Sequence, residues 1–299
     1  MPNRVYVHIG LPKTATTMLQ MDYFPYVDSN KYMYLGVFQP RDTESDELYY
    51  DLCYAINSGS NIFEVNAKIK KKLRDDSGSL IFSEEMFTVS QPGISWQKKI
   101  SNLAKVFEGI DFRILITIRE PVSAMFSFYV ESYYRYMDSN ESFSNLAINS
   151  NDFKIYHYDY ILNILERKFT RERIYIQKFE DLIIGDFSIV NRFLSFNGAG
   201  VNFISMNNRN QKRKTSTAIL IPKDLKFKRA DRLYQAVGGD RNVCAFIVKR
   251  TMERQLKRLL MLPCFAITVQ KPSDLEYREL MKIMRGSMEY MFKHYGIRY

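Results

Sequence analysis

The stretch "RVYVHIGLPKTATTMLQ", residues 4–20, constrains the fold more than any other part of the sequence. It opens with a short apolar run that predicts a buried strand, and it closes with the apolar spacing of a helix. Between the two lie a glycine, a proline, a lysine and three threonines. A strand that passes into a helix through so short a turn is the first half of a βαβ unit, which predicts a parallel sheet.

Short apolar runs and helical patterns alternate over most of the chain. Apolar runs predict strands over residues 4–9, 79–82, 112–118 and 173–177. Helical spacing of apolar residues predicts helices over residues 96–107, 123–136 and 158–168. This order predicts an α/β fold with a central parallel β-sheet flanked by helices.

No internal repeat and no low-complexity linker divides the sequence, so we predict a single domain over residues 1–299. Its core is expected over residues 1–222. A mostly helical C-terminal extension is expected over residues 223–299, where two basic stretches have helical apolar spacing. Residues 38–66 are polar and contain several tyrosines, which predicts a surface excursion.

The 299 residues carry a formal charge of +10. A basic surface favours anionic partners, such as phosphate or sulfate groups, nucleic acid, acidic glycans or a membrane face. The cysteines, Cys53, Cys244 and Cys264, show no CxxC pairing, which predicts neither a zinc site nor a disulfide framework. Free thiols, and the absence of any apolar run of about 18 residues, predict a cytoplasmic protein.

The turn after the first strand has the features of an anion site. Gly10 and Pro12 shape the turn, and Lys13 places a mobile positive charge in it. N–H groups at the start of the helix point toward the turn, where the helix dipole also favours an anion. Hydroxyl donors are added by Thr14, Thr16 and Thr17. The alternative is a capped turn with a solvated lysine. The turn is not a Walker A loop of the ATP-binding type, because the sequence lacks the pattern GxxxxGK[ST].

The sequence "GLPKTATT", residues 10–17, resembles the 5′-phosphosulfate loop of sulfotransferases that use 3′-phosphoadenosine 5′-phosphosulfate (PAPS). The usual form of that loop is GxPK(S/T)GTT, so Ala15 stands where glycine is common. If this position needs a positive φ, alanine costs stability there, whereas in a helical conformation it is harmless. The resemblance implies that Lys13 stabilises the leaving oxygen. It also implies that the 5′-phosphate is held by Gly10, Pro12, Lys13, Thr14, Ala15, Thr16 and Thr17.

Two later segments are similar to the same family. In "RILITIREPVSAMFSFYVESYYR", residues 113–135, a predicted strand ends before Arg119, and Ser127 follows in a predicted helix. The resemblance implies that Arg119 and Ser127 bind the 3′-phosphate, and a guanidinium fork suits phosphate oxygens. In "RIYIQKFEDL", residues 173–182, the resemblance places Phe179 near the adenine. The alternatives are a surface salt bridge for Arg119 and a plain core position for Phe179.

A basic loop, "NNRNQKRKTS", occupies residues 207–216. In the family that the chain resembles, a late basic loop closes over the 3′-phosphate. The resemblance therefore makes Lys212 and Arg213 candidates for this role, together with Arg209 and Lys214. The alternative is a solvated cluster of charge, which is common in polar loops.

Transfer to a hydroxyl requires a base that takes the hydroxyl proton. The motif "LIFSEEMF" puts Glu84 and Glu85 just after a predicted strand, at the edge of the sheet where ligands bind in open α/β folds. Carbohydrate sulfotransferases commonly use a glutamate there, so the resemblance implies Glu84 as the base, with Glu85 as the alternative. Both residues also suit the start of a helix, which is the structural interpretation. We interpret His8 as a structural residue at the end of a strand. His157 is a less favoured candidate for the base.

Tyrosines crowd residues 129–160, at positions 129, 133, 134, 136, 156, 158 and 160. Their aromatic faces and polar tips suit a sugar-binding cleft, and Arg135 is a candidate contact for an acidic glycan. The alternative is that they belong to the core, as helix-spaced aromatic residues usually do.

The resemblance implies a PAPS-dependent sulfotransferase acting on a hydroxyl, for which we expect a carbohydrate or glycolipid acceptor. We expect no metal ion, and a glycolipid acceptor would bring the protein into peripheral contact with a membrane. One alternative is a small-molecule kinase with a P-loop-like site, which needs an aspartate for Mg²⁺ at a strand end where Arg119 stands. The other is a basic nucleic-acid-binding protein, but the sequence has no recognition-helix module and no RNP-like strand.

Overall fold

The computed structural model describes residues 3–37, 46–75, 78–136, 141–195, 218–222 and 266–299. The chain divides into two compact units, one formed by residues 1–206 and 274–299 and the other by residues 207–273. The single-domain prediction stays a prediction, because residues 223–265, which make up more than half of the predicted extension, lie outside the described ranges.

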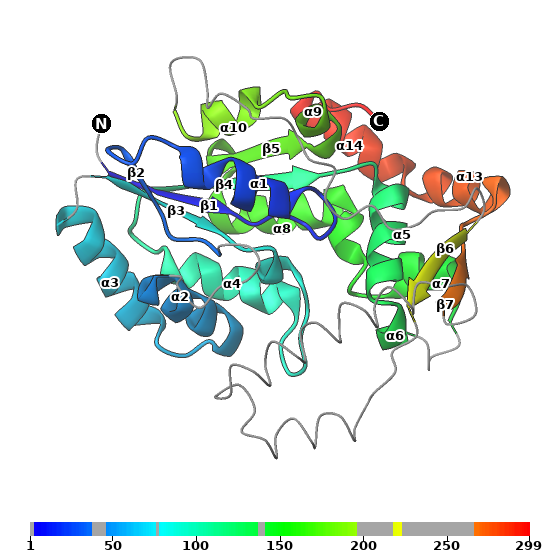
Figure 1. Cartoon of the computed structure of the whole chain (residues 1–299), viewed down its shortest axis with the longest axis horizontal. Coiled ribbons are helices and arrows are strands. Elements are labelled where there is room, and N and C mark those ends of the chain that lie inside the picture. The colour runs from blue at the N-terminus through cyan, green and yellow to red at the C-terminus, as the bar shows by residue number, and fades with distance from the viewer. Residues whose placement is uncertain (1–2, 38–45, 76–77, 137–140, 196–217, 223–265) are drawn as a thin grey trace, which may run out of the picture. The chain divides into compact units, whose positions relative to one another are not determined.

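The larger unit contains a five-stranded sheet in which every neighbouring pair of strands is parallel (Figure 1). Its order is β2 (Tyr32–Tyr34), β3 (Ser79–Ser83), β1 (Val5–His8), β4 (Phe112–Ile118) and β5 (Ile174–Lys178). The predicted strands are confirmed, and so is the predicted parallel sheet with flanking helices. The sequence analysis missed β2 because three residues are too few to show an alternating pattern.

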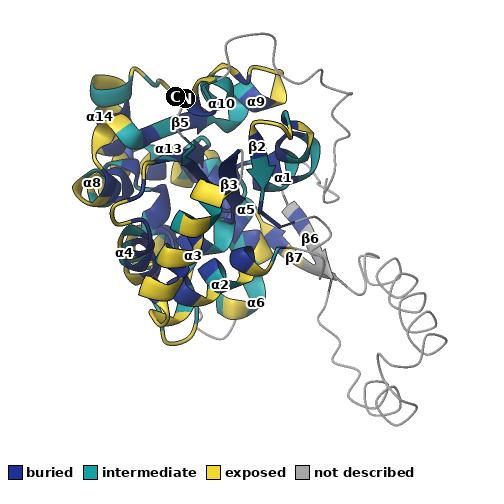
Figure 2. Ribbon diagram, turned by 90° about the vertical axis from the view of Figure 1, so that its left-hand side faces the viewer, coloured by how far each residue is buried: buried dark blue, intermediate teal, exposed yellow. Residues whose placement is uncertain are grey.

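Helices cover both faces of this sheet (Figures 1 and 2). On one side lie α1 (Thr16–Asp22) and α10 (Ser188–Phe193), and on the other lie α4 (Trp96–Val106) and α8 (Tyr158–Phe169). Side chains alternate between the two faces along each strand. One core cluster therefore joins alternate strand residues to the first pair of helices, and it includes Tyr6, Ile81, Leu115, Leu19 and Val190. In Figure 2 the buried residues line the strands and the inner sides of the helices.

The helix that follows β4 shows how local sequence sets an element boundary. Pro121 begins α5 (Pro121–Glu131), where a missing N–H costs nothing. The carboxylate of Glu120 caps this helix by accepting hydrogen bonds from the N–H groups of Val122 (3.0 Å) and Ser123 (2.7 Å). The predicted helix over residues 123–136 therefore begins earlier, and it is interrupted at Ser132 before α6 (Tyr133–Tyr136).

The larger unit also contains shorter and peripheral elements. Its other α-helices are α2 (Glu47–Ser58), α3 (Ile62–Asp75), α7 (Phe143–Asn149), α9 (Phe179–Ile183), α13 (Asp274–Ile283) and α14 (Arg285–Tyr295). Its 3-10 helices are η1 (Phe24–Tyr26), η2 (Glu85–Thr88), η4 (Lys154–Tyr156) and η5 (Arg171–Arg173). None of the helices in the described ranges combines the length and the apolar character that a membrane crossing requires.

The prediction of a surface excursion over residues 38–66 is wrong for its described part. This part forms α2 and the start of α3, and α2 buries Leu52, Ala55 and Ile56. The side-chain amide of Asn102 in α4 donates to the carbonyl of Ile56 at 2.9 Å, which ties α2 to α4. The many polar residues between these apolar positions hid the helical spacing.

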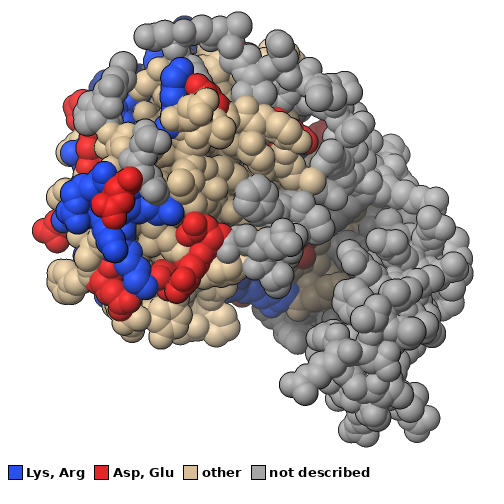
Figure 3. Space-filling model, turned by 60° about the vertical axis from the view of Figure 1, so that its left-hand side comes forward, with Lys and Arg blue, Asp and Glu red and all other residues tan. Residues whose placement is uncertain are grey.

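Charged side chains are interleaved on the outer surface of these two helices. Lys68 of α3 contacts Asp51 at 2.8 Å and Glu64 at 3.0 Å, and Lys72 contacts Asp46 at 3.8 Å. Figure 3 shows basic and acidic side chains next to one another on this side of the molecule. The net positive charge of the chain therefore forms no continuous basic surface on this face.

The smaller unit is described only in part. Within it, β6 (Ala218–Pro222) and β7 (Ala266–Gln270) form an antiparallel pair in which Ile219 lies opposite Val269. The predicted helical extension is confirmed over α13 and α14, whereas β7 is a strand inside the same predicted segment. The other basic helical pattern of the extension lies outside the described residues.

A buried lysine supports the segment that follows β3. Lys99 of α4 is fully buried, and its ammonium donates to the carbonyl of Met86 at 3.0 Å and to the side-chain oxygen of Gln91 at 2.9 Å. Burial lowers the pKa of Lys99 to about 8, although the nearby Glu84 and Cys53 act in the opposite direction. The ammonium therefore ties η2 and the residues after it to α4, at a cost in desolvation.

We predict that Lys99 makes the stability of the protein depend on pH above neutrality. Its pKa is about 8 when folded and about 10.4 when unfolded, so the unfolded chain binds more protons between these values. The free energy of unfolding should rise with pH over this window, by at most about 1.4 kcal/mol per pH unit. Urea unfolding at a series of pH values measures the slope. Lys99→Met should lack this rise, whereas the exposed control Lys105→Met should keep it; parallel slopes in all three proteins would contradict the prediction.

Candidate functional site

The segments predicted to form the site all follow the carboxyl ends of parallel strands. The turn of residues 9–15 follows β1, Glu84 follows β3, Arg119 follows β4 and Phe179 follows β5. Because β1, β3, β4 and β5 are consecutive and parallel in the sheet, these segments meet at one edge. Ligands of open α/β sheets bind at this edge, where the connections leave in opposite directions.

The turn after β1 has an unusual backbone, with two residues other than glycine at positive φ. Lys13 and Ala15 have positive φ angles of 67° and 71°, and Ala15 is the N-cap of α1. The N–H groups of residues 13–17 donate to no acceptor among the described residues. Five such donors in one turn form a site for an anion, because each N–H carries a partial positive charge.

Gly10 is required by close packing inside the turn. A Cβ atom at this position would lie 2.2 Å from the Thr16 hydroxyl and 2.8 Å from the His8 ring. No side chain fits in this space, so the glycine lets the turn fold back over the end of β1.

The threonine hydroxyls of the turn point mostly into the protein. The hydroxyl of Thr14 donates to the carbonyl of Leu11 at 2.6 Å and lies 2.6 Å from the hydroxyl of Thr117. The hydroxyl of Thr16 lies 3.5 Å from the same carbonyl, and both threonines are buried. Thr17 is half-buried. The hydroxyl proton of Thr14 is therefore already donated to a protein acceptor. Phosphate contacts from the three hydroxyls stay a prediction.

A buried polar network lies directly beneath the turn. The two ring nitrogens of His8 lie 2.8 Å from the Ser83 hydroxyl and 3.4 Å from the Thr117 hydroxyl. The side-chain amide of Gln20 donates to the Ser83 carbonyl at 3.1 Å. Burial lowers the pKa of His8 to about 3, so the ring is neutral. As predicted, His8 is a structural residue at a strand end.

Arg119, Phe179 and Lys13 come together beside the turn. The guanidinium of Arg119 lies over the Phe179 ring, 4.6 Å from its centroid, and donates to the Lys13 carbonyl at 3.4 Å. The Tyr158 hydroxyl donates to the Arg119 carbonyl, which holds the backbone of Arg119 in place. Arg119 thus presents a fixed cation a few ångströms from the turn, with the half-buried Ser127 on the helix that follows.

Glu84 is placed differently from the exposed base that the resemblance implies. Its side chain is buried; one carboxylate oxygen accepts from the N–H of Met86 at 2.8 Å, and the other accepts from the Tyr49 hydroxyl. These contacts are those of a helix cap at the start of η2, as in the structural interpretation. Glu85 begins η2 and is half-buried. The assignment of a base to either residue stays a prediction.

Glu131 and Tyr156 also contact the turn, and neither contact was predicted from the sequence. The carboxylate of Glu131, the last residue of α5, lies 3.4 Å from the ammonium of Lys13. The Tyr156 hydroxyl donates to the Pro12 carbonyl at 3.0 Å. Burial raises the pKa of Tyr156 well above its ordinary value, with contributions from Tyr158, Glu85 and Glu131. The helical spacing holds a signal for Glu131, because it lies one turn after Ser127 on the same side of the helix.

The tyrosine-rich region is largely packed. Tyr156 and Tyr158 are fully buried, which fits the core interpretation for these two. Tyr129 packs edge-on against Tyr133, with ring centroids 5.7 Å apart. Arg135, the candidate for an acidic glycan, pairs with the carboxylate of Asp152 at 3.0 Å.

Several predicted site residues cannot be placed. Lys212 and Arg213, with Arg209 and Lys214, lie outside the described residues. Among the residues that are described, no group of three or more His, Cys, Asp or Glu side chains is arranged to hold a metal ion.

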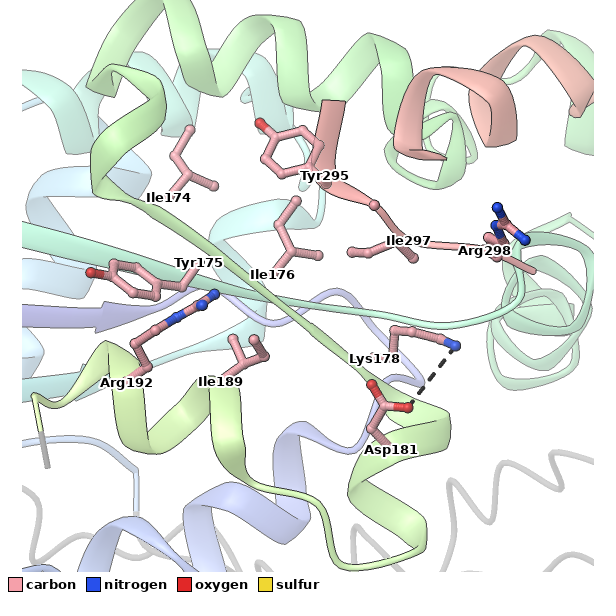
Figure 4. A pocket seen from close by; sticks show the side chains of 11 residues that line it. Ile174, Tyr175, Ile176, Lys178, Asp181, Ile189, Arg192, Tyr295, Ile297 and Arg298 are labelled. Carbon is pink, nitrogen blue, oxygen red and sulfur yellow. Dashed lines mark ion pairs between the residues drawn. The ribbon is translucent and has the colours of Figure 1, made fainter. Parts of the chain in front are cut away.

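A cavity of about 380 Å³ lies elsewhere, beside the edge strand β5 (Figure 4). It lies between this strand, α10 and the C-terminal residues, and its lining includes Tyr175, Lys178, Arg192, Tyr295 and Arg298. None of its lining residues belongs to the turn after β1. We therefore place the candidate site at the turn, where the unpaired N–H groups are, rather than in this cavity.

Comparisons with known proteins give distant similarity only. No family model matches the chain, and no curated protein matches it. Among solved structures, it is similar to a sulfotransferase from Alicyclobacillus acidocaldarius, with 14% identity, 70% of this chain and 88% of that chain covered, and a TM-score of 0.42. It is also similar to a sulfotransferase domain from the curacin biosynthetic pathway, with 12% identity, 67% and 76% covered, and a TM-score of 0.36. Similarity at this level carries no argument about activity, which rests on the site residues.

We predict that Ala15→Gly stabilises the protein. Ala15 has a left-handed backbone conformation, which costs an L-residue with a Cβ roughly 1–2 kcal/mol, whereas glycine adopts it readily. Glycine is more flexible in the unfolded chain, and the entropic cost of ordering it offsets part of this gain. The free energy of unfolding should therefore rise by about 1 kcal/mol. Denaturant unfolding measures the change. Ala104→Gly, in the last turn of α4, should instead lower stability, by up to about 1 kcal/mol. A loss of stability in both variants would show that position 15 is unstrained.

Proposed function

We propose that this protein is a sulfotransferase that moves a sulfuryl group from PAPS to an acceptor hydroxyl. The observation that carries the proposal is the turn of residues 13–17, whose N–H groups donate to no acceptor among the described residues and whose Lys13 supplies an ammonium. A second cation, Arg119, is fixed nearby on the ring of Phe179. A nucleotide with phosphates at both its 3′ and 5′ positions needs two such anion sites, one at each end.

The residues at the site match the demands of sulfuryl transfer. Negative charge builds on the oxygen that bridges sulfur and the 5′-phosphate, and fixed donors and cations that face this oxygen lower the barrier. We assign Lys13 to this oxygen and the N–H groups of residues 13–17 to the 5′-phosphate. We assign Arg119 and Ser127 to the 3′-phosphate, Phe179 to the neighbourhood of the adenine, and Lys212 and Arg213 to the closing loop.

The acceptor is proposed to be a hydroxyl of a carbohydrate or glycolipid. Tyr129, in the last turn of α5, packs against Tyr133, which begins α6 just after Glu131, and aromatic faces of this kind suit sugar rings. Because Arg135 is already paired with Asp152, a neutral sugar suits this region better than an acidic one. A glycolipid acceptor would place the protein at a membrane surface from the cytoplasmic side.

We predict that the protein binds 3′-phosphoadenosine 5′-phosphate more tightly than AMP or ATP, because only the first presents a 3′-phosphate to Arg119. Isothermal titration calorimetry with the three nucleotides measures the difference. Arg119→Lys keeps the charge but loses the guanidinium fork. It should therefore lower the affinity for 3′-phosphoadenosine 5′-phosphate at least tenfold, while the affinity for AMP should change little. Equal affinities for all three nucleotides would contradict the proposed co-substrate.

We also predict that Lys13→Ala abolishes transfer without unfolding the protein. The side chain of Lys13 is partly exposed and makes one ion pair among the described residues, so its loss should change the melting temperature little. Transfer of a labelled sulfuryl group from PAPS to hydroxyl compounds measures the activity. Lys31→Ala, which removes a comparable surface ion pair with Asp28, serves as the control. Near-normal turnover by Lys13→Ala would remove this residue from the mechanism.

A further inference from the structure

The ion pair between Lys13 and Glu131 places a carboxylate beside the reaction centre. The two side chains meet at 3.4 Å, and their exposed fractions are 26% for Lys13 and 55% for Glu131. Glu131 ends α5, which is anchored at its other end by Pro121 and the Glu120 cap. The carboxylate is therefore carried on a rigid helix and remains open to solvent, where an acceptor molecule would arrive.

Glu131 is better placed for proton transfer than Glu84. Both oxygens of Glu84 already accept hydrogen bonds from the protein, and its side chain is only 2% exposed. An acceptor could reach Glu84 only if the cap of η2 and the Tyr49 contact were broken. The partner of Glu131 is instead the ammonium of Lys13, a group that an anionic ligand in the turn would attract to itself.

We propose that Glu131 is the general base of the reaction, a role that rests on the proposed sulfuryl transfer. The ammonium of Lys13 must lie next to the oxygen that leaves sulfur. The attacking hydroxyl must lie roughly 3–3.5 Å from the sulfur, and its base within about 2.6–3.2 Å of that hydroxyl. Because the Glu131 carboxylate lies 3.4 Å from the Lys13 ammonium, it is close enough to the reaction centre to take the proton of the attacking hydroxyl.

The acceptor oxygen forms a bond to sulfur while its proton passes to a carboxylate oxygen of Glu131. The bond from sulfur to the bridging oxygen breaks, and its electron pair stays on the 5′-phosphate, where Lys13 and the N–H groups of the turn stabilise the charge. Before the nucleotide binds, the ion pair holds both side chains in place; once the nucleotide attracts Lys13, the carboxylate is available to the acceptor.

The test compares two acceptors that differ in whether they have a proton to lose. Octyl glucoside carries un-ionised hydroxyls, and 4-nitrophenol is already ionised at pH 8. With labelled PAPS as donor, Glu131→Gln should slow transfer to octyl glucoside by roughly 10²–10⁴-fold. Transfer to 4-nitrophenolate should stay at the wild-type rate, and Glu131→Asp should retain part of the activity toward the glucoside. Across a pH series, Glu131→Gln should also lack the fall in kcat/KM that we expect of the wild type at acidic pH.

Controls separate this inference from the proposed function. Glu64→Gln, at an exposed glutamate paired with Lys68 at 3.0 Å, should behave as the wild type with both acceptors. Calorimetry should show that Glu131→Gln binds 3′-phosphoadenosine 5′-phosphate at least as tightly as the wild type. Equal losses with both acceptors, or no loss with the glucoside, would overturn the role of Glu131. A wild-type protein that fails to bind the nucleotide, or binds it and transfers to neither acceptor, would overturn sulfuryl transfer itself.

Discussion

Buried hydrogen bonds beneath the turn after β1 fix the geometry on which the site depends. His8, Ser83 and Thr117 lie side by side on β1, β3 and β4, and the Thr14 hydroxyl joins them through Thr117 at 2.6 Å. The His8 ring is neutral because burial lowers its pKa to about 3, so the network buries no net charge. Leaving one of these groups unpaired would cost about 1–3 kcal/mol. The turn is therefore held from below, and the N–H groups of residues 13–17 donate to no acceptor among the described residues.

This anchoring explains why the remaining groups converge. Parallel strands deliver their carboxyl ends to one edge, so the residues after β4 and β5 necessarily lie beside the turn after β1. Arg119 then contacts the Lys13 carbonyl and rests on Phe179, while Tyr156 holds the Pro12 carbonyl. The carbonyls of Pro12 and Lys13 are thus satisfied by protein donors, whereas the N–H groups of residues 13–17 donate to no acceptor in the described part of the chain. That asymmetry is what an anion-binding turn requires.

The sequence predicted the sheet and the turn well because both depend on local patterns. Apolar runs marked β1, β3, β4 and β5, and the glycine, proline and lysine marked the turn after β1, whose role as an anion site stays a prediction. One error, the surface excursion predicted over residues 38–66, has a physical cause, because the helices of this segment pack against distant residues such as Asn102, which no local pattern shows. The hydrogen bond between Glu84 and Tyr49 also joins distant residues, and the role of Glu84 as a base stays a prediction. Glu131 was missed for the same reason, since its pairing with Lys13 joins residues far apart in the chain.

The most direct test of the account is a crystal structure of the protein with 3′-phosphoadenosine 5′-phosphate bound. We predict the 5′-phosphate on the N–H groups of residues 13–17 and the 3′-phosphate on the guanidinium of Arg119, with Lys13 turned from Glu131 toward the nucleotide. Binding of the nucleotide in the cavity beside β5, or a turn that contacts no phosphate, would contradict the account.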